Sequence, residues 1–119
     1  MRRFALAALF ALSATPAFAV DANAPEQCIT GPVEKTYGGT LWLVVSCSDG
    51  KSLVFVAKEG GKAAPFEFDL TFTGNDYDLT GHGKGDRKFT DAAYADLQKL
   101  TGKDVLDLLT ATKAAKNKN

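Results

Sequence analysis

The sequence contains few of the residues on which metal, redox or nucleic-acid chemistry depends. Its 119 residues include two cysteines, one histidine, one methionine and one tryptophan. The 14 basic residues equal the 14 acidic residues in number, so the formal net charge is zero. Because phosphate binding requires a concentrated basic face, this balance argues against nucleic acid as a partner. One histidine is too few for the usual four-ligand metal site, and we expect neither a metal nor a cofactor.

Long apolar runs are absent beyond the N-terminus. There, two arginines precede an apolar run over residues 4–12, and an Ala-Phe-Ala motif at residues 17–19 suits the cleavage site of a secretory signal. We therefore predict a signal peptide over residues 1–19, removed on Sec-type export, and one mature domain over residues 20–119. Loss of the two arginines leaves 12 basic against 14 acidic residues, a net charge of −2. No later stretch approaches the ~20 apolar residues that cross a bilayer, so we expect a periplasmic protein without membrane insertion after signal removal.

The two cysteines, Cys28 and Cys47, lie 19 positions apart. An even number of cysteines in an oxidising compartment predicts a disulfide bond. On the chain-entropy model, closing a loop of ~20 residues stabilises a fold by about 3 kcal/mol. Redox catalysis usually uses a C-x-x-C pair near a helix N-terminus, and the sequence has no such pair. We therefore interpret the two cysteines as a structural disulfide.

A β-hairpin is predicted around Asp49-Gly50, a dipeptide typical of a tight turn. It joins strands over residues 41–47 and 52–58, in which apolar side chains occupy both faces. A strand that is apolar on both sides must be covered on both sides or form a binding surface. We assign the face of Trp42 to the C-terminal helices, as core rather than as an interface anchor. The other face, which we assign to the N-terminal segment held by the disulfide, carries Leu41, Leu43, Val45, Val54 and Val56.

A second hairpin is predicted around Gly74-Asn75, between strands over residues 66–73 and 76–83. The first of these strands alternates apolar and polar residues throughout, which places one face in the core and the other in water. The register sets Glu67 opposite His82 on the outward face.

Two helices are predicted at the C-terminus. Thr90 is a suitable N-cap for the first, and residues 101–104 have the form of a capping box for the second. Strands first and helices last indicate an α+β fold rather than α/β. We expect four or five antiparallel strands, including two consecutive β-hairpins, with a C-terminal αα-hairpin packed on one face of the sheet.

The glycine-rich segment over residues 81–86 is a candidate phosphate-binding turn. Its spacing matches neither a P-loop nor a dinucleotide-binding motif, and the predicted helix begins too late to contribute its N-terminus. We favour a structural interpretation. The missing side chain of Gly81 would let helix residues 92–95 approach closely, with Phe68 covering the glycine from the neighbouring strand.

The outward face of the second hairpin is the main candidate interaction site. Four acidic residues occur there with no basic residue among them. Such a face can meet a cationic partner or bind a hard cation such as Ca²⁺, although no calcium-loop motif is present and a solvated face is the simpler interpretation. The acidic residues are Glu67, Asp69, Asp76 and Asp78. The candidate interaction face comprises Glu67, Asp69, Asp78 and His82.

His82 is the one residue whose ordinary pKa lies near neutrality, so general-base chemistry would depend on it. Nucleophilic catalysis also needs an activated Ser, Thr or Cys beside the base, and no motif supplies one. We therefore assign no catalytic residue and rank a hydrolase that uses His82 last among the hypotheses.

These patterns predict a non-catalytic module that binds or inhibits a protein, or serves as an accessory in the periplasm. Its expected partner is an envelope protein with a basic surface, and the module itself is expected to be a monomer. The alternative is a small-ligand carrier that uses a pocket between the sheet and the helices. A cavity larger than ~300 Å³ would favour this alternative.

Overall fold

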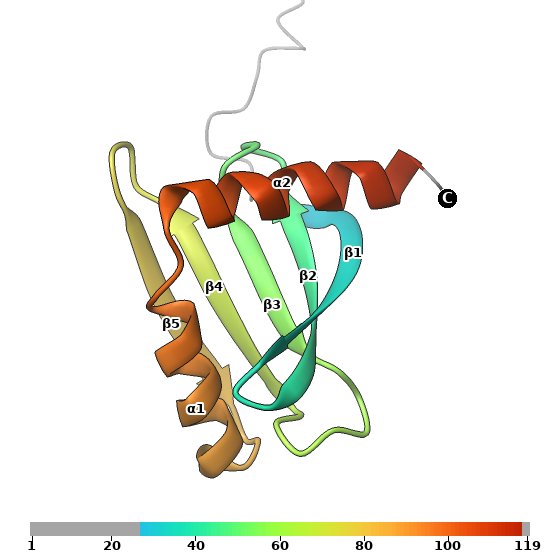
Figure 1. Cartoon of the computed structure of the whole chain (residues 1–119), viewed down its shortest axis with the longest axis vertical. Coiled ribbons are helices and arrows are strands. Elements are labelled where there is room, and N and C mark those ends of the chain that lie inside the picture. The colour runs from blue at the N-terminus through green and yellow to red at the C-terminus, as the bar shows by residue number, and fades with distance from the viewer. Residues whose placement is uncertain (1–26, 118–119) are drawn as a thin grey trace, which may run out of the picture.

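The computed structural model describes residues 27–117, so the predicted signal peptide and residues 20–26 lie outside the described part of the chain. Five strands come first and two helices follow (Figure 1). This order confirms the predicted α+β class. The elements are β1 (Cys28–Tyr37), β2 (Thr40–Cys47), β3 (Leu53–Ala57), β4 (Phe66–Phe72), β5 (Tyr77–Gly83), α1 (Arg87–Leu97) and α2 (Gly102–Asn117). Neither of these helices is long and apolar enough to span a membrane.

The strands form one antiparallel sheet in the order β1-β2-β3-β4-β5. Each strand therefore pairs with its neighbours in the sequence, and β1 and β5 are the two edges. Both predicted hairpins have the predicted register, because Leu43 pairs with Val56 in the first and Glu67 pairs with His82 in the second. The side chains of the second hairpin therefore alternate between the two faces of the sheet as expected.

The edge strand β1 begins at the disulfide and ends against helix α1. Cys28 and Cys47 form the predicted disulfide bond. The register of β1 shifts twice in its first half, which contains Pro32, a residue with no N–H to donate to a ladder. At the other end of β1, Gly38 has a φ of +60°, and a Cβ atom there would lie 2.3 Å from the backbone nitrogen of Ala93. Glycine is therefore required where the β1–β2 turn meets α1.

Helix α1 starts earlier than predicted. The prediction that Thr90 caps this helix is wrong, because the N-cap is Asp86, whose Oδ1 accepts a hydrogen bond from the backbone N–H of Lys88 at 2.9 Å. Thr90 lies inside the helix and is only 1% exposed. Both residues are good caps, and at Asp86 the carbonyl oxygen also accepts the backbone N–H groups of Phe89 and Thr90, each at 3.0 Å.

Helix α2 starts where the capping box predicted. The backbone N–H of Thr101 donates to Oδ2 of Asp104 at 2.9 Å, and the backbone N–H of Asp104 donates to Oγ1 of Thr101 at 3.1 Å. These backbone and side-chain hydrogen bonds with Thr101 lower the pKa of Asp104. The reciprocal bonds satisfy two N–H groups that the helix itself leaves unpaired.

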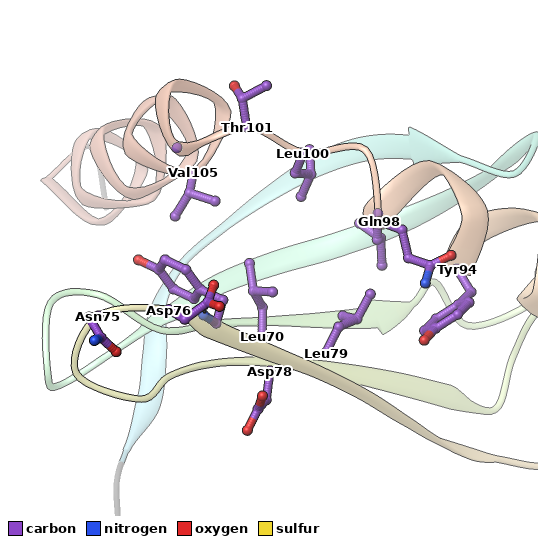
Figure 2. Close-up of a pocket in the computed structure, with 13 residues that line it drawn as sticks. Leu70, Asn75, Asp76, Asp78, Leu79, Tyr94, Gln98, Leu100, Thr101 and Val105 are labelled. Carbon is purple, nitrogen blue, oxygen red and sulfur yellow. Dashed lines mark hydrogen bonds between the residues drawn. The ribbon is translucent and has the colours of Figure 1, made fainter.

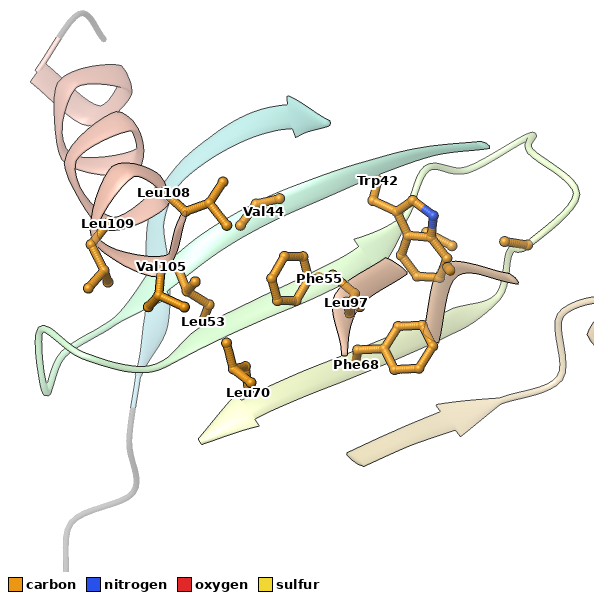
Figure 3. Close-up of a cluster of buried hydrophobic side chains, with 13 residues drawn as sticks. Trp42, Val44, Leu53, Phe55, Phe68, Leu70, Leu97, Val105, Leu108 and Leu109 are labelled. Carbon is orange, nitrogen blue, oxygen red and sulfur yellow. The ribbon is translucent and has the colours of Figure 1, made fainter. Parts of the chain in front are cut away.

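The hydrophobic core joins one face of the sheet to residues of both helices (Figure 3). Trp42 is fully buried in this core, and its indole N–H donates to the carbonyl oxygen of Tyr37 at 3.1 Å. The interpretation of Trp42 as core is therefore confirmed. We call the face of the sheet that carries Trp42 the inner face. Its main core partners are Val44, Leu53, Phe55, Phe68, Leu70, Ala93, Leu97, Val105, Leu108 and Leu109.

The opposite, outer face of the sheet is apolar on β2–β3 and acidic on β4–β5. We predicted that the N-terminal segment covers the apolar half, and for the described residues this is wrong. From Cys28 onward the chain pairs with β2 as a strand of the sheet, and Leu41 and Val56 remain 44% and 37% exposed. Residues 28–37 therefore form an edge strand of the sheet itself and do not lie over its outer face.

Candidate functional site

The acidic half of the outer face brings together three of the four predicted interaction residues. Glu67 and Asp69 project from β4, and His82 projects from β5 opposite Glu67. One ligand atom from each of the three lies within 4.8 Å of the others. We call Glu67, Asp69 and His82 the outer cluster. Two carboxylates and an imidazole are chemically able to hold a divalent cation or to face a cationic group of a partner.

The two carboxylates of the outer cluster interact strongly with each other. A hydrogen bond shared with the carboxyl group of Asp69 raises the pKa of Glu67, and partial burial and repulsion from Asp69 act in the same direction. The positive charge of protonated His82 opposes this shift. Moreover, Oδ1 of Asp69 is buried and has no hydrogen-bond partner among the described residues. The cluster is therefore short of hydrogen-bond donors and positive charge.

The fourth predicted residue, Asp78, extends the acidic surface along β5. It is exposed, pairs with Thr71 across the ladder and is not part of the outer cluster. Within the part of the chain that the structure describes, no Lys or Arg forms an ion pair with Glu67, Asp69 or Asp78. Three acidic residues elsewhere on the molecule do have such partners, in the pairs Lys58–Glu34, Arg87–Asp91 and Lys103–Asp107. Asp86, Asp96 and Asp104 instead accept hydrogen bonds from backbone N–H groups.

His82 is not placed for nucleophilic catalysis. Its Nε2 atom lies 3.9 Å from Oε2 of Glu67, which is beyond hydrogen-bond distance, and its side chain is 65% exposed. Among residues 27–117, no serine or threonine hydroxyl makes a hydrogen bond to it. Among residues 27–117, His82 therefore has neither a hydroxyl partner nor a hydrogen bond that orients its ring.

The glycine-rich segment has a structural role that differs from the predicted one. The nearest neighbours of a Cβ atom at Gly81 would be the rings of Phe68 and Phe66, the closest at 2.7 Å, whereas the close approach of helix α1 occurs at Gly38. The prediction that Phe68 covers Gly81 is confirmed. Phenylalanine rings, and not the backbone of helix α1, occupy the space next to Gly81, so the predicted close approach of the helix occurs instead at Gly38 in the β1–β2 turn.

The backbone after Gly83 is also unsuited to cradling a phosphate. The N–H groups of Lys84 and Gly85 both donate to the carbonyl oxygen of Pro65, each at 2.9 Å. Asp86 donates its N–H to the carbonyl oxygen of Lys62 at 3.3 Å. Because these three amides are already bonded within the protein, they do not form the free nest that anion binding requires.

A cleft of about 560 Å³ lies between the second hairpin and the two helices. Figure 2 shows Leu70 and Leu79 directed from the sheet toward Leu100 and Val105, whereas Asp78 points away to the other face. The rim is polar. It is formed by Asn75, Asp76, Tyr77, Tyr94, Gln98 and Thr101.

A second, smaller hollow of about 320 Å³ continues along β5 past Gly81. Tyr94 of α1 lines both the cleft and this hollow. Thr90 lines the hollow too, and its buried hydroxyl oxygen has no hydrogen-bond partner among the described residues. The sequence analysis did not identify Tyr94 or Thr90 as site residues. The one available signal was the lack of a side chain at Gly81, which the predicted register sets opposite Phe68.

Comparison with protein-family models, with curated proteins and with solved structures finds no match to this chain. A function must therefore be argued from the surface itself.

Proposed function

We propose that this protein is a non-catalytic binding module that docks a protein partner with a basic surface. The partner contacts the acidic half of the outer face, where Glu67, Asp69, Asp78 and His82 lie. In this proposal the module acts as a monomer and supplies neither a catalytic group nor a cofactor.

The observation that carries this proposal is the grouping of acidic residues, with ligand atoms of Glu67 and Asp69 within 4.8 Å of each other, on a face where no Lys or Arg of the described chain pairs with them. Glu34, Asp91 and Asp107 each have a Lys or Arg partner on the molecule, while the acidic residues of the β4–β5 face have none in the described part of the chain. Concentrating like charge in this way is unfavourable for the isolated molecule, as the raised pKa of Glu67 indicates. A cationic surface that approaches from outside would relieve this repulsion.

The test compares charge reversal inside and outside the proposed face. Tagged protein is crosslinked in its native cells, and the stoichiometric partner is quantified for the wild type, for Asp78→Lys and for Asp107→Lys. Both substitutions change the net charge equally, and both positions are exposed, but Asp107 lies on α2. We expect capture to fall at least about tenfold with Asp78→Lys and to stay within about twofold with Asp107→Lys. The purified complex should also weaken with rising salt.

Equal capture by both variants would contradict the proposal, because any residual binding would then not depend on the β4–β5 face. A matched stability measurement is needed for interpretation. Asp78 is exposed, so Asp78→Lys should change the free energy of unfolding by less than about 0.5 kcal/mol. A loss of several kcal/mol would show that Asp78 has a structural role instead.

A second candidate function is favoured by the size of the cleft. Its volume of about 560 Å³ is within the ~300–1,000 Å³ typical of small-molecule sites, and its floor is formed by leucine and valine side chains. In this case the protein carries a small ligand with both apolar and polar groups between β5 and the helices. Native mass spectrometry of protein purified from its own cells should then show a bound mass that is lost in the cleft variant Leu79→Asp.

We also propose that the protein is exported to the periplasm after removal of residues 1–19. The disulfide between Cys28 and Cys47 supports this proposal, because disulfides persist in oxidising compartments. N-terminal sequencing of the native protein should begin at Val20. An intact N-terminus in the cytoplasmic fraction would contradict the proposal.

A further inference from the structure

The strand β5 is an edge with free backbone hydrogen-bonding groups. The turn before it is closed by the N–H of Thr73, which donates to the carbonyl oxygen of Asp76 at 2.8 Å. In an antiparallel ladder, hydrogen-bonded and non-hydrogen-bonded residue pairs alternate. Since Asp76 is in a hydrogen-bonded pair, the backbone N–H and C=O groups of Asp78, Thr80 and His82 point toward β4. Those of Leu79 and Gly81 therefore face away from the sheet.

The β5 edge lacks the proline, lysine and β-bulges that commonly prevent strand pairing. Residues Tyr77–Gly83 contain no Pro, Lys or Arg, and their register with β4 has no bulge. The opposite edge, β1, has all of these devices, because it contains Pro32 and Lys35 and shifts its register twice. Both helices also pack against β1. The two edges thus differ in a way that favours pairing at β5.

The inner side of this edge offers two successive places for side chains. The cleft of about 560 Å³ lies beside Leu79, and the hollow of about 320 Å³ lies beside Gly81. Two positions along a strand are ~7 Å apart, so alternate residues of an added strand would reach one and then the other. The cleft is floored by apolar side chains, and aromatic side chains, those of Phe66, Phe68 and Tyr94, line the hollow.

The outer side of the same edge is acidic. Residues of an added strand opposite Asp78 and His82 would project onto the face that carries Glu67 and Asp69. Basic side chains at these positions would lie beside Asp78 and within about one Debye length, ~8 Å, of the outer cluster. The two sides of the edge therefore require different residue types at alternate positions.

From these placements we propose that an extended segment of the partner, with alternating apolar and basic residues, adds antiparallel to β5 as a sixth strand. Apolar residues opposite Leu79 and Gly81 enter the cleft and the hollow, and basic residues face the acidic outer face. Strand addition of this kind takes its affinity from backbone bonds and its specificity from alternate side chains. This inference rests on the proposed function and specifies the partner's conformation and sequence pattern.

The test uses blocked synthetic peptides that alternate leucine and lysine, with binding to the full mature protein followed by fluorescence anisotropy. Two isomers are compared, one N-methylated at the leucines and one at the lysines. In antiparallel addition the residues opposite Leu79 and Gly81 direct their N–H groups to β5, and these are the leucines. We expect methylation of the leucines to weaken binding at least tenfold and methylation of the lysines to change it less than about threefold. The amide protons of Leu79 and Gly81 should exchange more slowly when the unmethylated peptide is bound.

A second comparison separates this inference from the proposed function. Asp78→Lys should weaken the unmethylated peptide at least about fivefold, whereas Asp107→Lys should not. Equal binding of both N-methyl isomers overturns strand addition, even if Asp78→Lys still weakens binding and the charged face is used. Absence of peptide binding also overturns it, even where the cellular partner is still captured through the acidic face. If the peptide does not bind and Asp78→Lys also leaves capture of the cellular partner unchanged, both proposals are overturned.

Discussion

At the scale of single residues, the outer cluster is defined by unfavourable interactions rather than by favourable ones. Glu67 and Asp69 share a site that supplies no Lys or Arg, and a buried oxygen of Asp69 has no partner among the described residues. Such groups are costly to keep in a folded protein unless something outside it interacts with them. This is why the outer cluster supports a binding role, whereas the three acidic residues in ion pairs with Lys or Arg do not.

The first prediction concerns the titration of Glu67. Its pKa is raised mainly by the hydrogen bond shared with Asp69, so Asp69→Asn should move the pKa of Glu67 down toward the ordinary glutamate value. A carboxyl group with a raised folded-state pKa binds protons more tightly in the folded than in the unfolded protein. Its contribution therefore favours folding at low pH, and this stability is lost as the pH rises through the folded-state pKa. In Asp69→Asn, the free energy of unfolding should therefore fall less than in the wild type as the pH rises just above the ordinary glutamate pKa.

NMR titration of the Glu67 side-chain carboxyl carbon measures this shift directly. His82→Gln is the control, because protonated His82 lowers the pKa of Glu67 and its removal should move that pKa upward instead. A Glu67 pKa that is unchanged by Asp69→Asn would show that the two carboxyl groups do not share a proton.

The second prediction concerns Thr90. Because its buried hydroxyl lacks a partner among the described residues, Thr90→Val should stabilise the protein by about 1 kcal/mol while preserving its shape. Thr112 is a matched control, since its equally buried Oγ1 lies 2.8 Å from Oγ of Ser46 and is hydrogen-bonded to it. Thr112→Val leaves the Ser46 hydroxyl short of a partner and should destabilise the protein by ~1–3 kcal/mol.

Urea unfolding of both variants gives the two free energies. A destabilised Thr90→Val protein would mean that the hydroxyl has a hydrogen-bond partner in solution.

At the scale of helices and strands, the turn and cap sequences were the most reliable basis for prediction. Asp49-Gly50 and Gly74-Asn75 each fix one hairpin, and a hairpin's register follows from its turn and from the face that must be buried. The capping box at residues 101–104 likewise located the start of α2. The start of α1 could not be predicted in the same way, because Asp86 and Thr90 are both acceptable caps and the local pattern does not decide between them.

The site was predictable only in part, for a related reason. Alternation along β4 and β5 placed Glu67, Asp69 and His82 on one face, since only local register was needed. The cleft depends on the distance between β5 and the helices, which is set by where α1 packs. The close approach at Gly38 holds α1 near the β1–β2 turn, and no pattern within β5 encodes that contact.

The third prediction tests this contact between elements. Gly38 and Gly39 form one turn, and both have positive φ, at +60° and +79°. A Cβ atom at Gly39 would meet nothing within 4 Å, whereas one at Gly38 would lie 2.3 Å from the backbone nitrogen of Ala93. Gly39→Ala should therefore cost only the ~1–2 kcal/mol of the left-handed conformation. Gly38→Ala should cost a further ~1–3 kcal/mol because α1 must move.

Chemical denaturation of the two variants measures the difference. Because α1 lines the cleft through Tyr94 and Leu97, Gly38→Ala should also perturb NMR signals of these residues, and Gly39→Ala should leave them in place. Equal losses of stability in the two variants would show that the turn does not position α1.

At the scale of the whole molecule, the protein has one small core and one covalent constraint. The core occupies the inner face, while the outer face lacks cover over the described residues. A domain of ~100 residues buries somewhat less than ~70% of the surface of its unfolded chain, so its margin of stability is small. With a total of ~5–15 kcal/mol expected, a single added constraint is a large fraction of the whole.

The fourth prediction is that reduction of the Cys28–Cys47 disulfide weakens the fold by about 3 kcal/mol, as expected for closing a loop of this length. Urea unfolding of the same protein with and without reductant measures this change without altering any side-chain volume, and thiol labelling should detect no free cysteine before reduction. If the free energy of unfolding stays the same after reduction, the bond contributes nothing that the β1–β2 ladder does not already provide. A loss of the expected size would mean that the protein keeps its full stability only where the bond persists. Because disulfides persist in oxidising compartments, the sheet and its exposed outer face would then be fully stable in the periplasm, where we propose that the protein works.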